Sequence, residues 1–224
     1  MYRSASFFDE AERITGKLAT MKYPMKQDFL LAVRKASFYT PGSIVCSVIN
    51  DGKPVIGLTN ASVCRKFIDS TMLRTVVCGT IANTGIRLTA ETIEFRDFPF
   101  ITHTVTVENP MDEDFACDWL TYFDHEICGD NVKLIGADGT EQPLGIYGGK
   151  KAYLCYSDST VMIEADGDLH FRPDLCGAGF GMGVPDFKLA AGQSYTFPTI
   201  KILVCAGDKA RCEDLYRAWA QAHE

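Results

Sequence analysis

Most of the chain alternates apolar and polar residues with a period of two, which is the pattern of half-buried β-strands. From about residue 26 onward, segments rich in Val, Ile, Thr and aromatic residues recur between turn sequences that contain Gly, Asn, Asp and Pro. This arrangement is typical of β-sandwiches and barrels. We therefore predict antiparallel strands at 44–49, 54–58, 72–82, 86–95, 100–108, 115–123, 152–156, 160–165 and 196–205.

Two of the predicted strands indicate what surrounds them. In 100–108, alternation places His103 among apolar residues on one face and three threonines on the other, so one face is buried and one is wet. In 115–123, alternation places Cys117 and Leu120 on opposite faces, and both faces carry apolar side chains. We expect this second strand to be central in its sheet and covered on both sides.

Apolar residues at helical spacing occur near both ends of the chain. Residues 6–18 begin with a capping-box sequence and carry apolar residues at spacings of four, three and four, which predicts a short amphipathic helix. Asp208 is a candidate N-cap for a second helix over 208–223, with the apolar stripe Cys212, Leu215, Tyr216 and Trp219. The chain has no internal repeats and no low-complexity linker. We therefore divide it into a helical extension, 1–25, and a single β-domain, 26–224.

Composition and charge restrict the possible partners. The 224 residues include 22 Lys and Arg against 29 Asp and Glu, a net charge of −7. Such a chain lacks the basic field that attracts phosphate backbones and anionic lipids, so we expect neither nucleic acid nor membrane as a partner. With no apolar run long enough for a membrane span and no signal-peptide pattern, we expect a cytoplasmic protein.

The cysteines and glycines do not form a recognised cofactor motif. Nine cysteines, an odd number with no Cys-x-x-Cys pair, indicate reduced and mostly buried thiols, and we expect no metal and no cofactor. The glycines of 177–183 fit neither the dinucleotide nor the phosphate-loop pattern, so we expect a mobile or ligand-adjacent surface loop. Asp124–Glu126 and Asp168–His170 could offer metal ligands, and we interpret both as solvated turn residues.

Histidines are the main candidates for acid–base chemistry. His103 on an apolar strand face needs hydrogen-bond partners, and we prefer a satisfied core histidine to a functional one. No Gly-x-Ser-x-Gly elbow or other nucleophile with a positioned base is visible. His170, Phe171, Arg172 and Asp174 combine charged and aromatic groups, which suits either sugar hydroxyls and ring faces or a salt-bridged turn.

Three stretches follow one family pattern in order along the chain, over roughly residues 65–224: Leu88–Pro99 with Val105–Asn109, Asp118–Asp124, and Leu189–Pro198 leading to the helix at Tyr216–Arg217. They resemble the N-terminal β-supersandwich domain of bacterial α-galactosidases of glycoside hydrolase family 36. The resemblance implies an all-β fold, a large two-sheet antiparallel supersandwich of the galactose-mutarotase-like type, with a short N-terminal helix and a C-terminal helix.

The same resemblance implies a function without catalysis in this chain. The family's catalytic carboxylates lie in a (β/α)8 barrel after the sandwich, and this chain ends where the barrel should begin, without the Lys-x-Asp-x-Asn stretch of the nucleophile. Retaining hydrolysis needs two carboxyl groups about 5 Å apart, and we nominate no such pair. We therefore expect a non-catalytic sandwich domain, or a stand-alone relative, that supports carbohydrate recognition and subunit assembly.

The implied partners are a galactose-type sugar and either further copies of the chain or a downstream catalytic barrel. The candidate sugar contacts are Arg96, Asp97, His103, His170, Arg172 and Asp174. Two other functions stay open. A stand-alone carbohydrate-binding module would present an exposed aromatic platform. An aldose-epimerase-like enzyme acting on a hexose would need a histidine acid and a carboxylate base, for which the candidates are His103, His170, Glu108 and Asp174.

Overall fold

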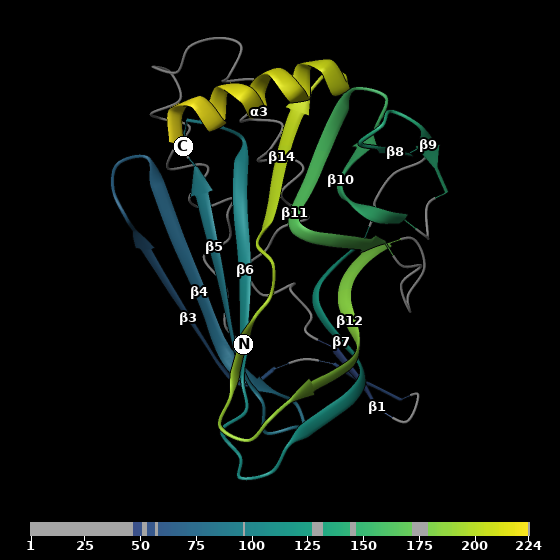
Figure 1. The fold of residues 1–224 in the computed structure, drawn as a ribbon. Helices are drawn as coiled ribbons and strands as arrows, with labels where there is room; N and C mark the ends of the chain where they lie inside the picture. Colours follow the sequence, from purple (N-terminus) through teal and green to yellow (C-terminus); the bar gives the residue numbers. More distant parts are fainter. Residues whose placement is uncertain are drawn as a thin grey trace.

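The computed structural model describes residues 47–50, 53–56, 58–95, 97–126, 132–143, 147–171 and 179–223. Within them the chain forms two β-sheets whose inner faces enclose a common core, and every pairing between described strands is antiparallel (Figure 1). The predicted all-β, two-sheet class is confirmed, and so is the C-terminal helix. The helix predicted over 6–18 lies outside the described residues, and the division at residue 25 remains a prediction.

The large sheet contains most of the strands. Their spatial order is β3 (Leu58–Phe67), β4 (Met72–Ile81), β5 (Arg87–Phe95), β6 (Phe100–Glu108), β14 (Ile200–Ala206), β11 (Ser159–Phe171), β10 (Tyr147–Cys155), β8 (Lys133–Gly136) and β9 (Glu141–Gln142), with β13 (Ser194–Thr196) paired to β6. The small sheet has the order β12 (Gly179–Leu189), β7 (Phe115–Glu126), β1 (Ser47–Asn50) and β2 (Lys53–Ile56). The predicted central place of the strand that starts at Phe115 is therefore confirmed.

The main core lies between the inner faces of the two sheets. From β6 it receives Val105 and Val107, which are fully buried, as the predicted alternation of this strand requires. The ring of Tyr122 from β7 stacks on Phe197 with 4.4 Å between centroids, and Phe187 of β12 lies beside them. Aromatic side chains thus fill the space between the sheets, where each buries a large apolar area.

A second core lies on the outer face of the large sheet, beneath α3 (Lys209–His223), which crosses one end of that sheet (Figure 1). Asp208 caps the helix, because its Oδ1 accepts a hydrogen bond from the Arg211 N–H at 3.0 Å. Trp219 stacks on Phe100 with 3.9 Å between ring centroids. The predicted apolar stripe is confirmed, with Cys212, Leu215 and Trp219 buried and Tyr216 packed against them.

Strict alternation along β7, which placed Cys117 and Leu120 on opposite faces, is wrong. Both side chains are buried in the main core. The neighbouring strand β12 also changes face, between Val184 and Phe187, and Asp186 between them has a φ of 48°. Left-handed backbone at this residue interrupts the pleat, so positions on either side no longer share a simple period of two.

The prediction of a surface loop for the glycine-rich run is also wrong from residue 179 onward, because Gly179–Leu189 is strand β12. Gly183 is buried against Trp119 of β7. A Cβ atom built on Gly183 would overlap the Trp119 indole ring. The glycine therefore allows a close contact between strands and is not a sign of chain mobility.

We predict that Gly183→Ala lowers the free energy of unfolding by about 1–3 kcal/mol, because the added methyl group must displace the Trp119 ring. Urea denaturation measures the change. Ala116→Ser, an addition of similar size at an exposed position of β7, is the control and should change stability by less than about 0.5 kcal/mol. Equal stability of the two variants would contradict this account of the glycine.

Candidate functional site

The structure describes only part of the predicted sugar-contact set. Asp97 is exposed in the turn between β5 and β6, and His103 is buried in β6, three residue pairs from the end of that hairpin. His170 belongs to β11, but its side chain is outside the described part, as are Arg96, Arg172 and Asp174 altogether. A common site formed by these residues therefore stays a prediction.

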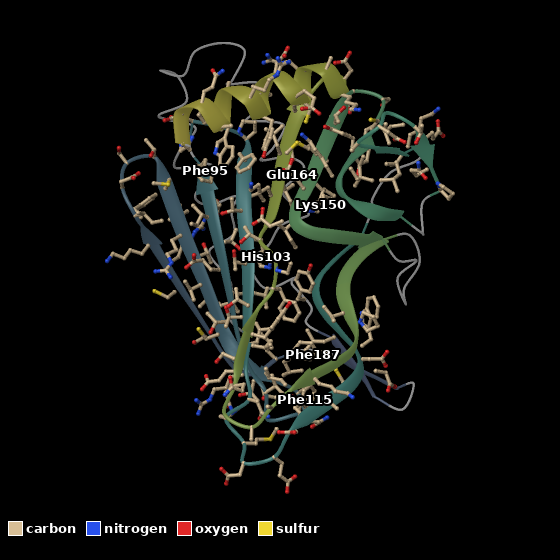
Figure 2. The ribbon with its side chains drawn as sticks, viewed as in Figure 1. Phe95, His103, Phe115, Lys150, Glu164 and Phe187 are labelled. Carbon is tan, nitrogen blue, oxygen red and sulfur yellow. The ribbon has the colours of Figure 1, made fainter. Side chains whose placement is uncertain are left out.

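A row of polar side chains crosses four strands on the inner face of the large sheet. The register pairs Arg65 of β3 with Thr75 of β4, Thr75 with Thr92 of β5, and Thr92 with His103 of β6. Directly opposite residues share a face, and Val105, two residues beyond His103, belongs to the main core. We call Arg65, Thr75, Thr92 and His103 the polar row; it begins at the sheet edge and ends mid-sheet, where Figure 2 labels His103.

Three of the four members of the polar row are buried. Thr75, Thr92 and His103 each expose 2% or less of their surface. Thr92 Oγ1 and His103 Nδ1 are hydrogen-bonded at 3.1 Å, which fits the interpretation of His103 as a core histidine. Burial disfavours the charged imidazolium and lowers the pKa of His103 to about 3. The ring is therefore neutral at physiological pH and a poor source of a proton for acid catalysis.

Arg65 forms an ion pair with Glu94, which follows Thr92 by two residues and shares its face of β5. The Arg65 Nη2 donates to both carboxylate oxygens, at 3.2 Å and 3.3 Å. The side chains are 20% and 14% exposed, so the pair is mostly shielded from water without being sealed off. Such a pair holds donors and acceptors in fixed positions at the rim of a buried polar row.

The polar row contains buried polar atoms that have no hydrogen-bond partner among the described residues. They include the Arg65 Nε and the Thr75 Oγ1, both buried and carried by directly opposed residues. A buried polar group without a partner costs about 1–3 kcal/mol, so two adjacent ones are unusual in a folded protein. A ligand hydroxyl that reached these atoms would remove part of that cost.

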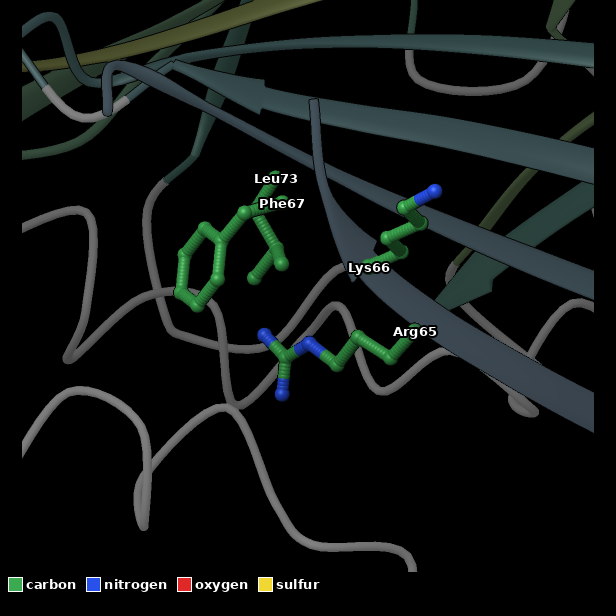
Figure 3. Close-up of a pocket in the computed structure, with 4 residues that line it drawn as sticks. All are labelled: Arg65, Lys66, Phe67 and Leu73. Atoms are coloured by element: carbon green, nitrogen blue, oxygen red, sulfur yellow. The ribbon is translucent and has the colours of Figure 1, made fainter. Parts of the chain in front are cut away.

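A pocket of about 440 Å³ opens beside these residues, and Arg65, Lys66, Phe67 and Leu73 line it (Figure 3). Phe67 and Leu73 are paired in register on neighbouring strands, and their side chains lie together as the apolar part of the wall. The Lys66 side chain points away from Arg65 and Phe67. The pocket thus combines one apolar side with a guanidinium that is already paired with a carboxylate.

A separate polar cluster joins α3 to the sheet. Lys201, Glu164 and Lys151 are neighbours in register on β14, β11 and β10, and Lys151 Nζ lies 3.4 Å from Glu164 and 3.2 Å from Glu213 of α3. The Tyr216 hydroxyl donates to Glu164 at 2.8 Å. Opposite charges alternate in this cluster, and Figure 2 places Glu164 close to α3. We interpret it as a joint that fixes the helix to the sheet.

Sequence reasoning did not find Arg65, Thr75 or Glu94. No strand was predicted between residues 58 and 72, so the pairing of Arg65 with Thr75 could not be predicted. The alternation of Leu73, Thr75 and Val77 in one predicted strand was the available signal, since it places a hydroxyl on an apolar face.

Among the residues that the structure describes, no group of three His, Cys, Asp or Glu side chains could hold a metal ion. No helix of the described residues is long and apolar enough to cross a membrane.

Comparisons with known proteins place the fold. No protein-family model matches the chain, and no curated protein matches it. A family 36 α-galactosidase from Geobacillus stearothermophilus matches 80% of this chain with a TM-score of 0.58 and 11% identity, over 32% of its own length. The α-galactosidase from Lactobacillus brevis matches 75% with a TM-score of 0.54 and 12% identity, over 29% of its length.

The chain has the fold of one part of these α-galactosidases. It spans about a third of their length. The expected supersandwich resemblance is therefore confirmed at the level of the fold. At this low identity the comparison transfers no site residues, so the polar row and the pocket must be judged by their own geometry.

Two threonines of the polar row provide a paired test of its hydrogen bonds. Thr75→Val should raise the free energy of unfolding by about 1 kcal/mol, because it replaces a buried hydroxyl that lacks a described partner with a methyl group. Thr92→Val should lower it by about 1–2 kcal/mol, because it removes the bond to His103 Nδ1. Urea denaturation measures the free energy of unfolding of both variants. A similar loss of stability in the two would mean that the Thr75 hydroxyl has a hydrogen-bond partner.

The lowered pKa of His103 predicts a pH dependence of stability. An unfolded chain binds a proton at this residue below about pH 6.5, whereas the folded chain does so only near 3. The stability that depends on a neutral His103 is therefore fully present above pH 6.5. As the pH falls toward 3, the free energy of unfolding decreases by up to about 1.4 kcal/mol per pH unit.

His103→Asn should flatten this part of the profile. The measurement is the slope of unfolding free energy against pH in urea titrations, compared with the unchanged protein, so that a constant loss of stability in the variant does not affect the result. An identical slope in both proteins would contradict a neutral buried His103.

Proposed function

We propose that this chain is a non-catalytic carbohydrate-recognition domain of an α-galactosidase-like protein. The observation that carries the proposal is the half-buried Arg65–Glu94 pair, which stands beside a pocket at the rim of the polar row. The sandwich fold shared with part of the α-galactosidases supports it. We expect a cytoplasmic protein that assembles with further copies of this chain or with a catalytic barrel.

The chemistry of the pocket suits a sugar ring. A pyranose presents hydroxyl groups that both donate and accept hydrogen bonds, and it has apolar patches of C–H groups on its faces. Arg65 can donate to these hydroxyl groups, while Phe67 and Leu73 offer an apolar surface for the ring. Binding sites for small molecules commonly combine an apolar wall with a few fixed polar groups in this way.

The carboxylates near the pocket support a binding role over a catalytic one. Glu94 is a carboxylate that contacts the polar row, and Arg65 binds both of its oxygens. Retaining hydrolysis needs a second carboxyl group about 5 Å away across the scissile bond. A neutral, buried His103 is likewise a poor acid for an epimerase.

The first ligands to test are galactose and raffinose. A family 36 α-galactosidase from Geobacillus stearothermophilus with this fold is known in complex with raffinose. Its own binding groups do not carry over at 10% identity, so raffinose serves here as a representative galactose-containing sugar.

Arg65→Met should weaken binding of galactose and raffinose by about tenfold or more, because it removes the charged donor of the pocket and keeps a side chain of similar length. Saturation-transfer NMR and calorimetric titration measure the effect. Arg74→Met is the matched control: it breaks the Arg74–Glu91 pair between the same sheet's strands, on the outer face. Undiminished binding by the Arg65 variant would refute this site, and absence of binding by the unchanged protein would refute the function.

A further inference from the structure

We propose that Cys205 and Cys212 form a thiol pair that a peroxide oxidises to a disulfide, which then fixes the start of α3 to β14. Cys205 belongs to β14 and Cys212 to the first turn of α3, with residues 206–211 between them. Both side chains are fully buried in the second core, on the outer face of the large sheet. The pair is therefore separate from the polar row, and the proposal does not depend on sugar binding.

The turn between β14 and α3 brings the two thiols together. The Cys205 thiol donates to the backbone carbonyl of Asp208 at 3.8 Å, and the same carbonyl accepts from the Cys212 N–H at 3.1 Å. The Cys205 and Cys212 side chains also hydrogen-bond to each other. Gly207, with a φ of 113°, allows the chain to fold back at this point. Contact between two thiols is the first requirement for a disulfide, and the fold supplies it here.

The strand register excludes a third thiol from the pair. Cys155 of β10 packs against the same core, but it lies opposite Thr160 of β11, and Thr160 lies opposite Cys205. Two strand spacings therefore separate Cys155 from Cys205, which places their Cα atoms about 10 Å apart. A disulfide needs Cα atoms within about 7 Å of each other. Among the thiols of the described residues beneath α3, Cys212 is thus the partner that Cys205 can reach.

The reduced pair is protected while the helix is closed. The hydrogen bond with Cys205 and burial together raise the pKa of the Cys212 thiol. The thiolate is the nucleophile in thiol oxidation, so the closed state reacts slowly. Gly207 and Asp208, which precede the helix, are exposed, and local opening of its first turn would admit water and peroxide. Oxidation then closes a bond between α3 and β14 and suppresses the opening that permitted it.

The reaction balances with hydrogen peroxide as the oxidant. The thiolate of one cysteine attacks a peroxide oxygen, the O–O bond breaks, and a sulfenic acid forms while the released hydroxide takes up the thiol proton as water. The second thiol attacks the sulfenic sulfur, the S–S bond forms, and a second water molecule leaves. Two electrons pass from the two sulfur atoms to the peroxide. A dithiol such as dithiothreitol reverses the change by thiol–disulfide exchange.

Peptide mapping of the full chain tests the pairing. The folded protein is treated with hydrogen peroxide, its remaining thiols are alkylated, and the digest is analysed by mass spectrometry. We expect a peptide pair in which Cys205 is linked to Cys212, and we expect dithiothreitol to abolish the link. Hydrogen exchange of the amides in the first turn of α3 should be about tenfold or more slower in the oxidised protein, because the disulfide restricts local opening.

Serine variants identify the thiols that are responsible. Cys205→Ser and Cys212→Ser should each abolish both the link and the slower exchange. Cys155→Ser, a change of the same size beside the same core, is the matched control and should retain both.

The mapping of the unchanged protein decides even where a serine variant fails to fold. Cys64 is exposed and serves as the internal reference for peroxide exposure. Cys205 and Cys212 that both stay reduced after Cys64 is fully oxidised would overturn the proposal, as would a link from either of them to a different cysteine. A correct link with unchanged hydrogen exchange in α3 would overturn the claim that the bond fixes the helix.

Discussion

The antiparallel register of β4, β5 and β6 is the constraint on which both cores and the polar row depend. The three strands pair without a break. The pairing runs from Met72 opposite Phe95 at one end to Arg87 opposite Glu108 at the other. Since side chains alternate between faces, a slip by one residue would move every inner residue of the slipped strand to the outer face. Val105 would leave the main core, and Phe100 would leave the stack beneath Trp219. A single register therefore buries the apolar residues on both faces of the sheet.

The large sheet separates these two surfaces and ties the helix to the sandwich. Its inner face packs against the small sheet, whereas α3 covers one end of its outer face. The row beneath the helix is apolar and aromatic, and the next row carries the charges of Lys201, Glu164 and Lys151. Contacts of both kinds fix the direction in which the helix leaves the sheet. In a larger assembly, such a rigid joint would set the position of whatever follows the helix.

The local sequence pattern was sufficient to predict some strands and helices and insufficient to predict others. The alternation of β6 and the capped stripe of α3 each reflect one clear boundary between core and solvent, so they could be predicted from the sequence. β3 could not, because an edge strand with mostly exposed residues lacks an alternating pattern. β12 was missed because its Gly183 makes room for Trp119, a residue more than sixty positions away along the chain.

The candidate site was missed for the same reason. Arg65, Thr75 and Glu94 come together through pairing across β3, β4 and β5, and no local motif marks them. Among the predicted sugar contacts, only His103 belongs to this row, and it was assigned to the correct face of its strand. A non-local register carries information that single-strand patterns lack.

The polar row has a cost that folding alone does not require. The adjacent row on the same face, Val77, Ala90 and Val105, is apolar and extends the core without leaving polar atoms in need of partners. Valine at Thr75 would continue that surface with nearly the same shape. Instead, the sheet buries a threonine hydroxyl and an arginine nitrogen that have no described partner, next to a pocket. Departures of this kind from the best choice for stability concentrate at functional sites. A sugar that supplies the missing hydrogen bonds would turn this local cost into binding energy, which is why the row points to recognition more strongly than the fold does.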